Sequence, residues 1–230
     1  MNSTDELLKN CTASLALVCH EMKNTVNSII GFSTMIASGN ENPKLKQYNK
    51  HIIRQNELLL RTLNDLIEVS RLELDSIRIE ARCFDFNGLL TDLYDIFSTK
   101  CPKKIKLSPV YFPREFYVIS DRIRLRQVFI NLLSNALKNT EQGEIAFGLS
   151  TREKSQIICF VSDTGKGIPI EQQNNIFSLF FKSDPTAQGI GLGLSIVKNI
   201  IKLMKGRVWL ESSPGKGSVF YFSLPVKYSK

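Results

Sequence analysis

Residues 131–140 read NLLSNALKNT and lie within a helix that the sequence predicts near residues 122–140. Asn131, Asn135 and Lys138 recur at i, i+4 and i+7, so all three project from one face of that helix. A row of two amides and an ammonium indicates a magnesium ligand beside a phosphate-binding lysine, because Mg²⁺ prefers hard oxygen ligands. The solvated polar face of a purely structural helix is the alternative interpretation of the same row.

Residues 157–169 read IICFVSDTGKGIP, an apolar strand that runs into Asp163 and is followed by Gly165 and Gly167. The carboxylate would lie at a strand end, where glycines let the backbone bend tightly. There it could accept a hydrogen bond from an exocyclic amine such as adenine N6, and the glycines would let the base approach. An ordinary turn after a strand explains the same letters.

Residues 188–194 read QGIGLGL and open a helix predicted near residues 190–205. Gly189, Gly191 and Gly193 alternate along it, which bares backbone N–H groups at a helix N-terminus, a favourable place for phosphates. The spacing matches neither GxGxxG nor GxxxxGK[ST] and so argues against Rossmann and P-loop sites. A further pair, Gly215 and Gly217, precedes the last strand and is equally explained by a hairpin turn.

The first eighty residues contain few glycines, a single proline and long helical periodicity. The letters SGNENP at 38–43 predict a turn between two antiparallel helices. Each helix has only a narrow apolar row, which two hairpins would bury in a four-helix bundle, so we expect a homodimer. The first row, with heptad a and d spacing, contains Cys11, Leu15, Val18, Met22, Thr25, Ile29, Phe32 and Ile36; the second contains Leu45, Tyr48, Ile52, Leu59, Leu63 and Leu66.

His20 falls at heptad position f, opposite the apolar row of the first helix. A histidine there is exposed on a rigid helix and available to react. The adjacent Glu21 could orient the imidazole and take its proton during nucleophilic attack. Asn24 lies one turn further on the same face, where its amide could reach a group bound at His20. An incidental surface histidine is the alternative interpretation of this position.

From about Arg78 onward strands and helices alternate, which predicts an α+β sandwich with the helices on one face. The sequence thus divides into a helical hairpin over 1–78 and a second domain over 79–230. The predicted strands lie near 78–82, 105–111, 116–120, 143–150 and 156–162, the helices near 86–99, 122–140 and 190–205, and a closing hairpin at 206–226.

The 230-residue chain has a net charge of +8, which favours an anionic ligand. It has no basic block or basic–aromatic row, so we expect no nucleic-acid partner. The five cysteines form no CxxC pair, which argues against a zinc site, and scattered thiols suit a reducing cytosol. No apolar run approaches the length of a membrane span. We expect a cytoplasmic fragment of a membrane-bound parent, without direct membrane contact of its own.

In order and separation, these motifs together resemble those of the histidine kinases of two-component signalling. That family belongs to the wider group of ATPases that includes gyrase and the mismatch-repair and heat-shock chaperone ATPases. The resemblance covers almost the whole chain. His20 to Asn24 resembles the H box, Asn131 to Thr140 the N box, Asp163 to Gly167 the G1 box, Phe177, Phe180 and Phe181 the F box, Gly189, Gly191 and Gly193 the G2 box, and Gly215 to Gly217 the last glycine motif.

The resemblance implies a Bergerat-type ATP-binding fold after the hairpin, with ATP and Mg²⁺ bound there. It implies that His20 is the phosphoacceptor, that Glu21 is the general base and that Asn24 positions water for phosphatase activity. A receiver domain of a separate response regulator would take the phosphoryl group on an aspartate. The nucleotide-binding positions implied are Asn135 on Mg²⁺, Asn131 and Lys138 on the phosphates, Asp163 on the adenine amine, and Gly165, Gly167, Ile168, Phe177, Phe180, Gly189, Gly191, Leu192 and Gly193.

Two departures from the family pattern favour alternatives. Thr25 stands where the family usually has a proline, so the helix keeps a backbone N–H there and should be straighter. The segment 178–188, which would form the lid over ATP, is short. Both features suit a dimeric scaffold that binds ATP without transferring phosphate. An ATP-gated clamp like gyrase is a third interpretation, but a clamp does not need the exposed His20–Glu21 pair.

Overall fold

The computed structural model describes residues 22–24, 26–36, 42–73, 78–152, 156–183, 191–225 and 227–228. Among them the chain forms two compact units. The first contains the helical residues up to 73, together with 191 and 192. The second contains the residues from 78 to 183 and from 193 onward. No helix of the described part is both long and apolar enough to cross a membrane.

The first unit is an antiparallel pair of helices. Residues 22–24 and 26–36 are helical, and α2 follows over Pro43–Glu73. Asn42 begins α2, since its side-chain oxygen accepts a hydrogen bond from the backbone N–H of Lys44 at 3.0 Å. Lys23 donates to Asn64 at 3.2 Å, and the buried Asn49 donates to the backbone oxygen of Ser33. As the residue number rises on one helix and falls on the other, these two contacts establish the antiparallel direction.

Much of the apolar surface of this hairpin is exposed. Val26, Ser33, Asn49 and Leu63 are buried. Val26 and Ser33 are offset by one residue from the predicted apolar row of the first helix, so that row is not the face that packs within the hairpin. The exposed large apolar side chains of the two helices are Met22, Ile29, Phe32, Met35 and Ile36 on the first and Leu45, Tyr48, Ile52 and Leu59 on α2.

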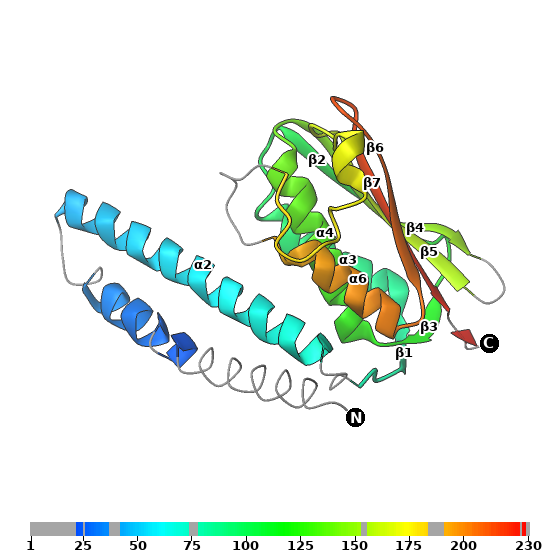
Figure 1. Ribbon diagram of the computed structural model, residues 1–230, viewed down its shortest axis with the longest axis horizontal. Coiled ribbons are helices and arrows are strands. Elements are labelled where there is room, and N and C mark those ends of the chain that lie inside the picture. Colours follow the sequence, from blue (N-terminus) through cyan, green and yellow to red (C-terminus); the bar gives the residue numbers. More distant parts are fainter. Residues whose placement is uncertain are drawn as a thin grey trace. The chain divides into compact units, whose positions relative to one another are not determined.

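The second unit is built on a five-stranded sheet with the order β2-β4-β5-β7-β6 (Figure 1). The β2–β4 pair is parallel and the other pairs are antiparallel. A smaller sheet has the order β1-β3-β8. The strands are β1 (Arg82–Asp85), β2 (Ile105–Val110), β3 (Tyr117–Ser120), β4 (Gly143–Arg152), β5 (Gln156–Asp163), β6 (Arg207–Ser213), β7 (Gly217–Pro225) and β8 (Lys227–Tyr228).

The long helices of this unit, α3 (Phe86–Ser98), α4 (Arg122–Asn139) and α6 (Gly193–Leu203), lie on one face of the large sheet (Figure 1). The short α5 (Ile170–Gln173) follows β5. This arrangement confirms the predicted α+β sandwich with its helices on one face. Along β5, buried and half-buried residues alternate, because one side of the strand packs under the helices.

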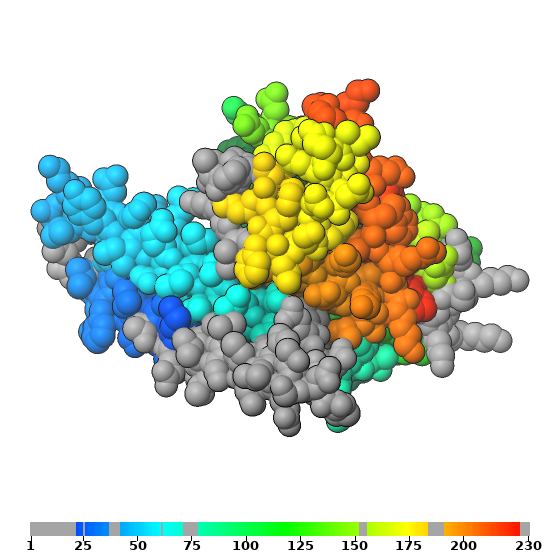
Figure 2. Space-filling model, viewed as in Figure 1, coloured from blue at the N-terminus to red at the C-terminus, as the bar shows by residue number. Residues whose placement is uncertain are grey.

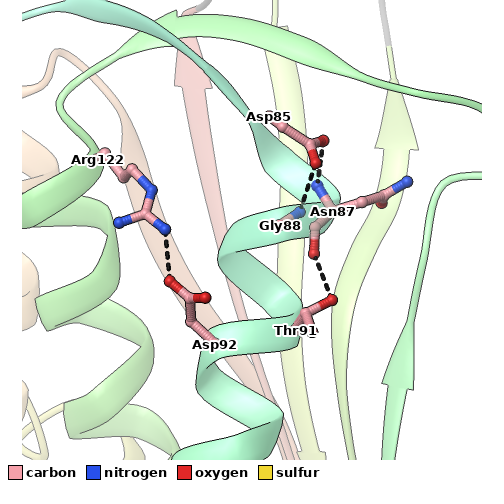
Figure 3. Close-up of polar contacts among 6 residues, drawn as sticks. All are labelled: Asp85, Asn87, Gly88, Thr91, Asp92 and Arg122. Atoms are coloured by element: carbon pink, nitrogen blue, oxygen red, sulfur yellow. Dashed lines mark hydrogen bonds and ion pairs between the residues drawn. The ribbon is translucent and has the colours of Figure 1, made fainter.

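The ends of α3 and α4 are set by local side-chain contacts. Asp85 caps α3 by accepting hydrogen bonds from the backbone N–H groups of Asn87 and Gly88 (Figure 3). Asp121 caps α4 in the same manner through the N–H of Arg124 at 3.0 Å. An exposed ion pair between Arg122 and Asp92, at 2.5 Å, joins the two helices.

Three details differ from the sequence prediction. The first strand was predicted at 78–82 but forms over Arg82–Asp85, because it pairs with the four residues of β3. Ahead of it, the backbone N–H of Glu80 bonds to the Asp121 carboxylate instead of to a strand. The helix predicted over 190–205 is described over Gly193–Leu203. The short α5 and β8 are not predicted from the sequence.

Phe129 lies at the centre of the core of the second unit. Its ring makes edge contacts with Phe86 of α3, Phe147 of β4 and Phe222 of β7, with centroid distances of 6.4, 6.2 and 5.2 Å. All four side chains are completely buried. Such edge contacts add to the free energy gained by burying the rings. One side chain of α4 therefore ties that helix to another helix and to two strands.

We expect Asp121→Ala to lower the free energy of unfolding of the second unit by about 1–3 kcal/mol, because α4 loses its cap and the Glu80 N–H loses its acceptor. Asp92→Ala is the control, since its exposed ion pair contributes at most about 1 kcal/mol. The measurement is urea unfolding followed by the fluorescence of Trp209, the only tryptophan of the chain. Equal losses in the two variants would contradict this assignment.

Candidate functional site

The polar row of α4 lies along one edge of the buried face of the helix. Asn131 and Asn135 are half-buried and Lys138 is exposed. The buried side chains of the same helix are Leu125, Val128, Phe129, Leu132, Leu133 and Ala136. Because those residues fix the rotation of α4 about its axis, the two amides and the ammonium are held together along the edge of the buried face.

Asp163 ends β5 and is buried, with 5% of its surface exposed. Burial raises the pKa of its carboxyl group, and hydrogen bonds from the backbone N–H groups of Gly165 and Ser218 oppose that effect. The Gly165 N–H lies 2.9 Å from the carboxylate. A buried carboxylate to which few protein N–H groups donate is a strong acceptor for a ligand amine.

The turn after Asp163 packs directly against the last turn of α4. A Cβ atom at Gly165 would lie 2.2 Å from the backbone oxygen of Asn139, so no other residue fits there. The backbone N–H of Lys166 donates to that same oxygen at 3.3 Å. This backbone contact makes the polar row of α4 and the carboxylate at the end of β5 one candidate site, which we call the α4–β5 site.

The turn between β6 and β7 supports this site from the other side. A Cβ atom at Gly217 would lie 1.9 Å from the backbone oxygen of Asp163, and Gly217 has φ of +88°, which favours glycine. Gly215 donates its N–H to the oxygen of Lys166 at 2.8 Å, and Ile168 donates to the Ser212 hydroxyl at 2.8 Å. The last glycine motif is thus a hairpin turn that also holds the Asp163 turn in place. Gly167 is buried within that turn.

Lys138, Lys166 and Lys182 lie near one another at the site, and the sequence motifs point to a role for Lys138 alone. Partial desolvation, followed by the nearby charges of Lys182 and Lys166, lowers the pKa of Lys138. Three neighbouring positive charges raise the local positive potential, which attracts a polyanion such as a triphosphate. No motif pointed to Lys182, because it comes near Lys138 only through the fold.

The remaining predicted nucleotide contacts have different surroundings. Phe177 packs edge-on against Phe220 with centroids 6.3 Å apart, so it is anchored in the core. Phe180 is 58% exposed, and the segment around it lies at the surface (Figure 2). At the start of α6, Leu192 is buried, and a Cβ atom at Gly193 would meet nothing within 4 Å. Gly191 has φ of +78°. Gly189 lies outside the described residues.

Of the predicted catalytic residues, the structure describes only Asn24. Its side chain is exposed on the first helix, one residue from Lys23, which contacts Asn64 of α2. His20, Glu21 and Thr25 lie outside the described residues.

The oxygen ligands and the lysines at the α4–β5 site suit a nucleotide bound with Mg²⁺. The described residues contain no group of three or more histidine, cysteine or acidic side chains that could enclose a metal. Mg²⁺ commonly uses only one or two protein oxygens and takes its other ligands from phosphates and water. Next to Asn139, the Thr140 hydroxyl is the one buried side-chain polar atom of the described part without a hydrogen-bond partner.

Comparison with protein families gives two matches along the chain. Residues 12–75 match the His Kinase A (phospho-acceptor) domain. Residues 120–228 match the histidine kinase-, DNA gyrase B-, and HSP90-like ATPase. The first match covers the helical hairpin, and the second lies within the unit that carries the α4–β5 site, from β3 onward.

Individual relatives are sensor kinases. The chain is 34% identical over 225 residues to the autoinducer 2 sensor kinase/phosphatase LuxQ of Vibrio vulnificus, a match that covers 93% of this chain and 26% of LuxQ. It is 32% identical to the adaptive-response sensory kinase SasA of Thermosynechococcus vestitus, which covers 92% of this chain and 59% of SasA. The chain thus spans about a quarter of LuxQ and about three fifths of SasA.

Solved structures give the same result. Full-length ShkA in complex with AMPPNP superposes with a TM-score of 0.83 at 27% identity, over 94% of this chain and 46% of ShkA. The catalytic domain of the histidine kinase ThkA superposes with a TM-score of 0.57 at 35% identity, over 64% of this chain and 95% of that domain. With both family regions present in order, this chain belongs to the sensor histidine kinases.

Proposed function

We propose that this chain phosphorylates its own His20 with ATP and passes the phosphoryl group to an aspartate of a response-regulator receiver domain. One observation carries the proposal. The end of α4, the helix that carries the amide row, packs against the turn that follows the buried Asp163, in a chain that also contains a phospho-acceptor region. An anion-attracting group of lysines beside that site supports a triphosphate as the ligand.

In this proposal different side chains bind different parts of the nucleotide. Asp163 accepts a hydrogen bond from the adenine amine, while Asn131 and Lys138 bind the phosphates. Asn135 supplies a carboxamide oxygen to Mg²⁺, which neutralises phosphate charge when bound. Lys166 and Lys182 add positive charge beside Lys138. Gly165, Gly167, Ile168, Phe177, Phe180, Gly189, Gly191, Leu192 and Gly193 complete the proposed nucleotide site.

The transfer itself is a displacement at the γ-phosphorus of ATP. A ring nitrogen of His20 attacks phosphorus, a nitrogen–phosphorus bond forms, and the bond to the oxygen of ADP breaks. Glu21 takes the proton that the imidazole releases. The protein contributes position and charge rather than a further covalent step. This route needs the proposed helical domain over 1–78 and the proposed ATP-binding domain over 79–230 to approach each other.

Partner and location follow from the same proposal. The exposed apolar rows on both helices of the hairpin support pairing with a second copy in a four-helix bundle. Asn24, exposed on the first helix, would direct water at the phosphorylated receiver in a phosphatase reaction, a capacity named for the relative LuxQ. Use of ATP and the free thiols of Cys83, Cys101 and Cys159 support a cytoplasmic site of action.

We expect His20→Gln to abolish incorporation of γ-labelled phosphate while leaving ATP affinity unchanged, because glutamine has no nucleophilic ring nitrogen. His51→Gln is the matched control, as His51 is the only other histidine and is exposed on α2. The measurement is labelling with γ-labelled ATP and Mg²⁺, followed by acid and alkali treatment of the product. Acid-stable label, or label that persists in His20→Gln, would contradict the proposal.

Asp163→Asn should weaken ATP binding about 10- to 100-fold, because the amine loses a charge-assisted hydrogen bond. In the wild type, affinity should also fall as the pH drops through the pKa of this carboxyl group. Because burial raises that pKa, the loss should begin above the pH at which an ordinary aspartate is protonated. The measurement is the dissociation constant of ATP against pH. The same acid-side loss in Asp163→Asn would contradict the assignment of the titrating group.

Lys182→Gln should weaken ATP binding by roughly 2- to 5-fold, the effect of one partly solvated charge. It should leave the affinity for adenosine unchanged, because adenosine has no phosphates. Lys202→Gln, at the exposed last turn of α6, is the control for a change of net charge. Calorimetric titration with each ligand tests this. An equal loss of adenosine affinity would show that Lys182 acts on the fold instead.

A further inference from the structure

Two amide side chains meet at the end of α4. The amide nitrogen of Asn139 lies 2.7 Å from the backbone oxygen of Asn135 and 3.1 Å from its side-chain oxygen. Both side chains are half-buried, so water competes only partly for these contacts. The family resemblance assigned a metal role to Asn135 and left Asn139 without one.

The chemistry of the two partners determines which side-chain atom of each asparagine is the nitrogen and which is the oxygen. A backbone carbonyl oxygen only accepts hydrogen bonds, so the Asn139 atom beside it must be the donor NH₂ group. The side-chain atom of Asn135 facing that NH₂ group must then be its acceptor oxygen. The Asn135 amide is therefore held in one of its two possible orientations. Its oxygen accepts one hydrogen bond from Asn139 and keeps a second lone pair for another partner.

Asn139 itself is held by the other half of the site. Its backbone oxygen accepts the N–H of Lys166 and lies against Gly165, in the turn that follows Asp163. The position of the Asn139 donor is thus set by the β5 turn, and the orientation of the Asn135 amide is set by Asn139. A chain of direct contacts leads from the turn beside Asp163 to the Asn135 oxygen.

We propose that Asn139 is a positioning residue that presents the Asn135 side-chain oxygen to Mg²⁺. This inference rests on the proposed function, in which that oxygen is a metal ligand. Without Asn139 the Asn135 amide is free to rotate, and its NH₂ group, which repels a cation, would face the metal for part of the time. Outer partners that orient a ligand commonly change metal affinity by about 10- to 100-fold.

A purely structural role for Asn139 makes a different prediction. Its bond to the backbone oxygen of Asn135 would by itself satisfy one carbonyl in the last turn of the helix. Serine can make that same bond to the residue four positions earlier, but its shorter side chain does not reach the Asn135 amide. Asn139→Ser therefore separates the two roles, and Asn139→Leu removes both bonds while keeping the approximate shape.

The experiment measures binding of a fluorescent ATP analogue to the 230-residue chain, first in EDTA and then during titration with Mg²⁺. We expect Asn139→Leu and Asn139→Ser to raise the half-saturating Mg²⁺ concentration by about 10-fold and to leave affinity in EDTA unchanged. Asn139→Gln keeps a donor amide and should recover part of the loss. In an Asn135→Ala background, Asn139→Leu should cause no further change, because its effect passes through Asn135.

The outcomes separate this inference from the proposed function. Wild-type binding that depends on Mg²⁺, together with an unchanged Mg²⁺ requirement in Asn139→Leu, would overturn the positioning role alone. An equal Mg²⁺ shift in the Asn135→Ala background would also overturn it. Absence of Mg²⁺-dependent binding in the wild type would overturn the proposed function and this inference with it. Unfolding curves from Trp209 fluorescence confirm that each variant is folded.

Discussion

The packing of α4 through Phe129 is the constraint on which the rest of the second unit depends. The ring joins α4 to α3, β4 and β7, and the apolar side chains on the same face of the helix are buried. A helix fixed in rotation by its apolar face has its polar face fixed as well. The core and the proposed ATP site therefore use adjacent faces of one helix, and a change in the core packing would move the proposed ligands.

Backbone contacts carry this constraint across the site. The turn after Asp163 contacts the last turn of α4 on one side and the β6–β7 turn on the other. Glycines at 165 and 217 are needed where these backbones meet. The motif glycines of these turns thus allow segments of the protein's own backbone to pack closely against one another. Beside these closely packed turns, the three lysines repel one another, and binding a triphosphate would relieve that repulsion. The site thus combines close backbone packing with positive charge that favours an anion.

Features that depend on interactions between residues close along the chain are predictable from the sequence, and features that depend on distant residues are not. The predicted boundaries of α3 and α4 agree closely with the structure, because Asp85 and Asp121 cap them through neighbours two or three residues away. The first strand was placed too early, since its extent is set by pairing with β3, more than thirty residues further along the chain. Lys182 was missed for the same reason, because its approach to Lys138 leaves no periodic pattern. The offset between the predicted apolar row and the buried Val26 arose because periodicity does not say which partner a face will meet.

The sequence by itself determined the fold class, the family motifs and the identity of the polar residues on α4, because helical period, caps and motif spacing are local properties. Only the tertiary structure decided how those residues work together. It joined the Asn139 backbone to the Asp163 turn, oriented the Asn135 amide and brought three lysines to one place. Each of these depends on a contact between elements that are distant in sequence or on the direction of a single side chain, and no pattern of letters encodes either directly.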